Sequence, residues 1–138
     1  MSRTAFLALA AAALVGGCAA TPEQQARTAE RRADSAARLD KALAGFTAEQ
    51  PQSCMPITNP RRTEYYGDTI IYEVSGNLVY RNDTTGGCAL ERDDILVTST
   101  PLGRLCRGDI ARTVDRASRF NTGSCALGDF VPYRKRRS

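Results

Sequence analysis

Four cysteines in the C-terminal two thirds of the chain constrain its fold more than any other sequence feature. Cys54, Cys88, Cys106 and Cys125 form no C-x-x-C pair, and the 138-residue sequence contains no histidine that could complete a zinc site. An even number of cysteines in a small exported domain predicts two disulfides rather than a metal centre. We therefore predict neither a metal nor a cofactor.

Four cysteines allow three pairings. Cys54 opens the predicted folded region and Cys125 lies near its end, whereas Cys88 and Cys106 flank a predicted hairpin. We therefore favour the pairs Cys54–Cys125 and Cys88–Cys106, and the alternative is the sequential pairing Cys54–Cys88 and Cys106–Cys125. Each bridge should contribute about 2–4 kcal/mol, which is a large share of the stability of a domain with a thin core.

The first eighteen residues have the pattern of a bacterial export signal. Arg3 precedes an apolar run over residues 5–15, and Gly16-Gly17 leads to Cys18. The run is too short to span about 30 Å of hydrocarbon as a helix. Its end is similar to a lipobox, in which an apolar residue and two small residues precede an acylated cysteine. We predict lipidation of Cys18; the alternatives are an ordinary secretory signal and an uncleaved anchor.

A lipid on Cys18 would hold the mature protein on a membrane, because several acyl chains on one residue exceed what stable anchoring requires. Ala19 follows Cys18, where lipoproteins retained at the inner membrane have an aspartate. By this analogy the expected location is the periplasmic side of the outer membrane, with the membrane as a partner through the lipid.

The charge distribution argues against a nucleic-acid partner. Arg3 and the basic residues at positions 134–137 contribute five positive charges, and the net charge of the whole chain is +4. The rest of the chain is therefore close to neutral. A nucleic-acid surface needs basic residues arranged along one face. We expect residues 134–138 to form a frayed, solvated tail, and the alternative is a contact with anionic lipid head groups.

Residues 21–46 predict a helix. Thr21, Pro22 and Gln24 have the pattern of a capping box with proline in the first turn. The run is rich in alanine and charge, and its large apolar residues share one face near its end: Leu39, Leu43 and Phe46. This pattern favours a solvated spacer that docks through its last turns, and the alternative is a helix that binds a partner.

The remainder of the chain predicts a mainly β domain, because apolar residues alternate and turn residues recur every eight to twelve positions. We expect a small antiparallel β-sheet or an open barrel. The predicted organisation is a signal peptide (1–17), a lipid-anchored helical spacer and linker (18–53), a disulfide-stapled β domain (54–133) and a basic tail (134–138). Three hairpins are predicted: strands 69–74 and 78–82, strands 95–99 and 104–107, and strands 109–115 and 124–127 joined through 121–123.

Carboxylates are the strongest candidates for catalysis in a chain without histidine. The best are Asp93, Asp94 and Asp109, and Asp83 joins the first two as a candidate calcium ligand. All lie beside predicted turns, where aspartate commonly bonds to the backbone, and they lack the spacing of a calcium loop. We therefore assign no catalytic residue.

Arginine and tyrosine dominate interface hot spots, which directs attention to Arg61, Arg62, Tyr65 and Tyr66. These residues lie in a predicted loop or edge strand, so at least one ring should be exposed and the four are a candidate binding surface. Tyr72 and Tyr80 alternate with apolar positions and should be core.

The sequence resembles a family of small proteobacterial envelope lipoproteins known only as a domain of unknown function. The similarity covers most of residues 50–133 and includes the four cysteines, the C-x-G-D pattern from Cys106 and the C-x-L-G-x-F pattern from Cys125. It implies an exported, disulfide-bonded and lipid-anchored protein. The family has no activity or site to transfer.

These features favour a non-catalytic binding or structural module of the envelope, whose partner is an envelope protein or polymer. The alternative is a histidine-independent periplasmic hydrolase acting on glycan, which requires two convergent carboxylates about 5–9.5 Å apart.

Overall fold

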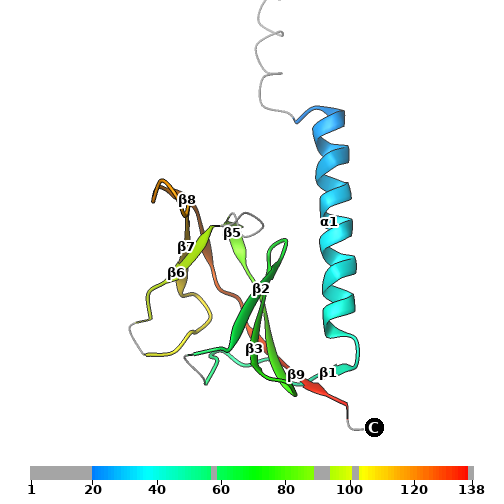
Figure 1. Ribbon diagram of the computed structural model, residues 1–138, viewed down its shortest axis with the longest axis vertical. Helices are drawn as coiled ribbons and strands as arrows, with labels where there is room; N and C mark the ends of the chain where they lie inside the picture. The colour runs from blue at the N-terminus through cyan, green and yellow to red at the C-terminus, as the bar shows by residue number, and fades with distance from the viewer. Residues whose placement is uncertain (1–19, 57–58, 89–93, 101–102, 137–138) are drawn as a thin grey trace, which may run out of the picture. The chain divides into compact units, whose positions relative to one another are not determined.

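The computed structural model describes residues 20–56, 59–88, 94–100 and 103–136 (Figure 1). The described residues form one helix followed by strands in two antiparallel sheets, which confirms the predicted mainly β fold with an N-terminal helix. The elements are α1 Pro22–Leu43, β1 Phe46–Ala48, β2 Arg62–Tyr66, β3 Thr69–Ser75, β4 Leu78–Asp83, β5 Thr85–Gly87, β6 Ile95–Thr98, β7 Ile110–Val114, β8 Asn121–Ala126 and β9 Phe130–Lys135.

Helix α1 begins with the predicted capping box. The Thr21 amide donates to Gln24 Oε1 at 3.0 Å, and the Gln24 amide donates to Thr21 Oγ1 at 3.3 Å. The helix ends at Leu43, earlier than predicted, because Gly45 adopts a φ of 86°, which interrupts the helical backbone. Phe46 consequently opens β1 instead of closing α1.

The chain divides within α1 into two compact units, and the boundary in the sequence lies between Arg32 and Ala33. In the first unit the described part of the helix is largely solvated and carries the Glu23–Arg27 ion pair at 2.7 Å. In the second unit Leu39 is buried with Ile71 and Val79, and Leu43 and Phe46 pack against this cluster. The prediction that Leu39, Leu43 and Phe46 dock is confirmed.

The first sheet has the strand order β1-β9-β4-β3-β2. The predicted β3–β4 hairpin is confirmed, with Tyr72 opposite Tyr80 and both rings buried. The predicted linker instead contains β1, in which Phe46 pairs with Lys135. Arg134 and Lys135 lie in β9, so the prediction of a frayed tail is wrong for these two residues.

The second sheet has the order β5-β8-β7-β6. Strand β6 pairs with β7, with Ile95 opposite Val114, so the prediction that it pairs with residues 104–107 is wrong. Cys106 of that segment bridges Cys54 instead, and a turn follows at once, in which Gly108 has a φ of 87° and Asp109 Oδ2 accepts the Cys106 amide at 2.8 Å. The third predicted hairpin is present as β7–β8, but residues 121–123 belong to β8 and the turn lies before them.

The two sheets share their longest strands. Strand β4 continues into β5, β8 continues into β9, and these continuous segments pair with each other in both sheets. At the corner the buried Asn82 amide replaces the missing ladder bonds: its Nδ2 donates to the Gly128 carbonyl at 2.8 Å, and its Oδ1 accepts the Gly128 amide at 3.1 Å. Between the sheets lies the main core, which includes Met55, Ile70 and Phe130.

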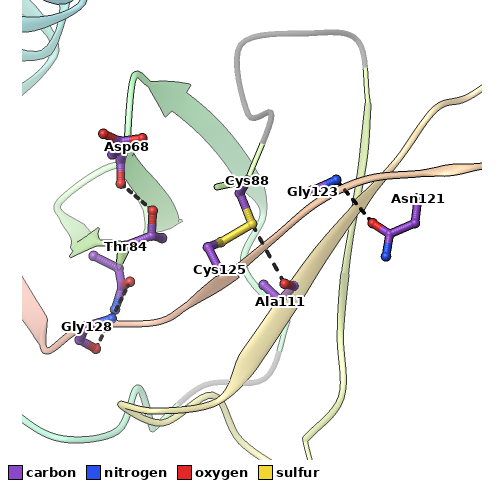
Figure 2. Close-up of a disulfide and its surroundings, with 9 residues drawn as sticks. Asp68, Thr84, Cys88, Ala111, Asn121, Gly123, Cys125 and Gly128 are labelled. Carbon is purple, nitrogen blue, oxygen red and sulfur yellow. Dashed lines mark hydrogen bonds between the residues drawn. A yellow bond between two sulfur atoms is a disulfide. The ribbon is translucent and has the colours of Figure 1, made fainter. Parts of the chain in front are cut away.

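Two disulfides close this core, Cys54–Cys106 and Cys88–Cys125, and Figure 2 shows the second of them. The presence of two bridges confirms the prediction, but both the favoured and the sequential pairing are wrong. Cys54 and Cys106 are neighbours in an isolated β-bridge, with Cα atoms 4.0 Å apart. Cys88 directly follows β5, and the pairing of β5 with β8 brings it beside Cys125.

Candidate binding groove

A groove of about 290 Å³ lies between the last turns of α1 and the first sheet, within the second compact unit. Its apolar lining comes from α1, β1, β3 and β4, its charged rim comes from β2 and β3, and one end is closed by the β3–β4 turn. The lining residues are Ala42, Phe46, Ile71 and Val79; Arg62, Glu64 and Glu73; and Ser75 and Gly76.

Strand register explains this mixture of apolar and charged residues. In the β2–β3 pair, Arg62 lies opposite Glu73 and Glu64 lies opposite Ile71. Because alternate residues of a strand point to the same face, Ile71 and Glu73 both face the groove, as do Arg62 and Glu64 across from them. Docking of the helix then covers Ile71 and leaves Glu73 at the rim.

Both oxygens of the Glu64 carboxylate are already bound within the rim. Arg62 Nε lies 2.9 Å from Glu64 Oε1, and the Tyr66 hydroxyl donates to Glu64 Oε2 at 2.6 Å. Arg38 of α1 lies over the Tyr66 ring, 5.7 Å from its centroid. These contacts fix the position of Glu64 and Tyr66.

The pKa of Tyr66 reports this environment. Burial, the hydrogen bond to Glu64 and the Glu64 charge raise the pKa to about 12, and the charges of Arg38 and Arg62 oppose the rise. Tyr66 is therefore a neutral donor to Glu64 at physiological pH.

Glu73 differs from Glu64. It is half-buried, and its carboxylate makes no ion pair with another described residue. Because Arg62 contacts Glu64, Glu73 is the carboxylate of the groove lining that is available to a ligand.

The four residues predicted to form a binding surface do not lie on one face. Arg62 is on the groove rim with its side chain 68% exposed. Tyr65 points to the opposite face of β2, where it packs against the main core and burial raises its pKa. Tyr66 and Tyr65 are both half-buried, so the expectation of an exposed ring is wrong. Arg61 precedes β2, and its amide donates to the Glu73 carbonyl at 2.7 Å.

Each acidic candidate in the described part of the chain has a hydrogen-bond partner of its own. Asp83 accepts from Thr69 at 2.6 Å and from Arg81 at 3.0 Å. Asp94 accepts from the Thr122 hydroxyl at 2.5 Å, and Asp109 caps the turn that contains Cys106. Asp93 and the predicted lipidation site Cys18 lie outside the described residues.

Two kinds of feature are absent from the described part of the chain. It contains no cluster of three or more histidine, cysteine, aspartate or glutamate residues that could hold a metal. Within the same residues, no helix is long and apolar enough to cross a bilayer.

Comparisons with protein-family models, curated proteins and solved structures find no match to this chain. The groove residues that sequence reasoning missed are therefore identified by geometry alone. One signal was available: Glu64 and Glu73 alternate with the core residues Tyr65 and Tyr72, so they share the opposite face of their strands with Ile71.

Proposed function

We propose that the protein is a non-catalytic binding module of the bacterial cell envelope, anchored by a lipid on Cys18 at the periplasmic side of the outer membrane. The main support is the pair of disulfides, because such bridges form and persist in an oxidising compartment. Export by the signal pattern that ends at Cys18 would provide that compartment.

The contacts of the carboxylates favour binding over hydrolysis. A glycosidase needs one carboxyl group that can donate a proton and a second that can act as base or nucleophile. Asp83, Asp94 and Asp109 are instead engaged in hydrogen bonds that organise strands and turns.

The groove fits a lysine or arginine side chain of an envelope protein. Its volume of about 290 Å³ is at the lower limit for small-molecule sites, which suits a protruding side chain. Ile71, Val79 and Phe46 offer apolar surface to an aliphatic stem, and Glu73 offers a charge to its head. A long basic side chain meets both requirements.

The anchoring is tested by intact mass spectrometry of the protein isolated from its host membranes. We expect a chain that begins at Cys18 and carries the mass of its acyl groups, and a Cys18→Ala variant that accumulates as precursor or is released from membranes. An unmodified N-terminus, or unchanged membrane partitioning of Cys18→Ala, would contradict the proposal.

The groove is tested by NMR titration with Nα-acetyl-lysine amide and with its neutral analogue Nα-acetyl-norleucine amide. We expect shifts confined to amides around Ile71, Glu73 and Val79, several-fold weaker binding of the analogue, and the same weakening for lysine amide in Glu73→Gln. Glu23→Gln, on the solvated helix, is the matched control. Equal binding of both ligands, or shifts outside the groove, would contradict this use of the site.

A further inference from the structure

The large hydrophobic side chains that are exposed in the described part of the chain all belong to the second sheet and its β7–β8 turn. Val97 is 48% exposed, Ile110 is 51% exposed and Phe120 is 76% exposed. Phe120 lies directly before β8, at the tip of the hairpin. Phe120 is the most exposed of the three and the one at the turn, whereas Ile110 pairs with Ala126 at the other end of β7.

The hairpin tip holds Phe120 in a fixed position. The Asp115 amide donates to the Phe120 carbonyl at 2.9 Å, and the Arg119 amide donates to the Asp115 carbonyl at 2.9 Å. Asp115 Oδ1 also accepts from the Ser118 amide and the Ser118 hydroxyl, each at 2.7 Å. The exposed ring therefore sits on an ordered turn.

Arg119 has an unfavourable backbone conformation. Its φ is 64°, which makes it the one non-glycine residue with a positive φ in the described ranges. Glycine adopts this conformation readily, whereas the Cβ of other residues opposes it. This left-handed residue closes the turn before β8, as in many hairpin loops, and it places the arginine next to the most exposed phenylalanine.

The hairpin tip is also basic. Arg116 and Arg119 lie in the turn, with Asp115 as its acidic residue, and Arg112 lies farther along β7 opposite Ser124. Asp115 Oδ1 accepts the turn hydrogen bonds, and Arg119 adjoins the exposed Phe120 ring. The combination of arginines and one protruding aromatic ring matches the boundary of a bilayer, where phosphates lie above acyl chains.

We propose that the β7–β8 hairpin tip docks on a phospholipid bilayer, with the Phe120 ring entering the interface and Arg119 contacting lipid phosphate. A nucleic acid would need a basic face that the nearly neutral body does not supply. The inference uses the proposed anchoring only to bring the chain to a membrane, and it is independent of the groove.

The chain contains no tryptophan, so Phe120→Trp introduces a single tryptophan, whose emission can be excited selectively over that of the tyrosines. The full-length purified protein is mixed with phosphatidylcholine vesicles that contain or lack phosphatidylglycerol. With anionic vesicles we expect a blue shift of the emission and quenching by brominated acyl chains. Neutral vesicles and high salt should give much smaller changes. Tyr133→Trp, on β9 of the first sheet, is the control and should not respond.

Arg119→Gln in the Phe120→Trp background should weaken the response to anionic vesicles roughly fivefold, as expected for one charge near such a surface. Arg119→Gly should weaken it equally while leaving the fold intact, which separates the loss of charge from unfolding. Equal responses to dextran sulfate and to vesicles would overturn the bilayer assignment in favour of a polyanion.

Unchanged fluorescence of the Phe120→Trp variant with anionic vesicles would overturn the docking proposal whatever the state of Cys18. Mass spectrometry of the same sample reports lipidation separately. If the protein is lipidated but the fluorescence of the introduced tryptophan does not change, the anchoring proposal stands and the hairpin contact is rejected. If the fluorescence changes but Cys18 carries no lipid, the hairpin contact stands and the anchoring proposal is rejected.

Discussion

At the scale of single residues, the corner between the sheets depends on a glycine. A Cβ at Gly128 would overlap the carbonyl oxygen of Asp83, which is backbone and has little freedom to move. Gly128→Ala should therefore lower the free energy of unfolding by at least about 2 kcal/mol, measured by urea denaturation. Gly87→Ala is the control, because nothing lies within 4 Å of its added methyl group. Equal stabilities of the two variants would contradict this account of the corner.

The Tyr66–Glu64 contact makes stability depend on pH in the alkaline range. Because the pKa of Tyr66 is raised to about 12, its contribution is complete below pH 10 and is lost as the pH rises through about 12. Tyr66→Phe removes the hydroxyl, so it should be less stable than the parent at about pH 9. The difference should shrink as the pH approaches about 12. The measurement is urea denaturation at both values, and a difference independent of pH would refute the role of Glu64.

At the scale of elements, the two disulfides join segments that are distant in the sequence. They connect residues separated by 52 and 37 positions. By loop entropy each should contribute about 4 kcal/mol, with little difference between them. Paired substitutions, Cys54→Ala with Cys106→Ala and Cys88→Ala with Cys125→Ala, should lower the unfolding free energy by similar amounts in chemical denaturation.

The pairing itself is checked by proteolysis without reduction. Trypsin should release one disulfide-linked peptide pair containing Cys54 and Cys106 and another containing Cys88 and Cys125. A linked pair containing Cys54 and Cys125 would contradict this arrangement of strands.

Local signals predicted the elements well where the decisive interactions are local. The capping box at Thr21, the β3–β4 hairpin and the docking face at Leu39 all follow from spacing within a few residues. The pairing of β6 with β7 was missed because the proline and glycine at positions 101 and 103 suggested a tight hairpin. The turn capped by Asp109 instead sends residues 104–107 to Cys54.

The groove was harder to predict because it is assembled from distant segments. Glu73 and Phe46 are 27 positions apart and line the same groove because β1 joins the first sheet through β9. Arg62 was identified from its residue type, whereas Tyr65 and Tyr66 were grouped although adjacent strand residues point to opposite faces. Period-two alternation would have separated them.

At the scale of the whole molecule, the shared β4–β5 and β8–β9 segments should make the two sheets unfold together. Hydrogen exchange under native conditions should give similar opening free energies for amides of β3 and β7, which lie in different sheets. Gly128→Ala should lower both by the same amount. Loss of protection in one sheet alone would show that the sheets unfold separately.

The pairing of β1 with β9 has a mechanical consequence. Phe46 opposes Lys135, so the N-terminal end of one strand lies beside the C-terminal end of the other. A force pulling these two ends apart would unzip the pair one hydrogen bond at a time instead of shearing it. The covalent bridges at Cys54 and Cys125 would then arrest the peeling from either side. The segments outside them would therefore extend first, before the disulfide-closed core bears the force.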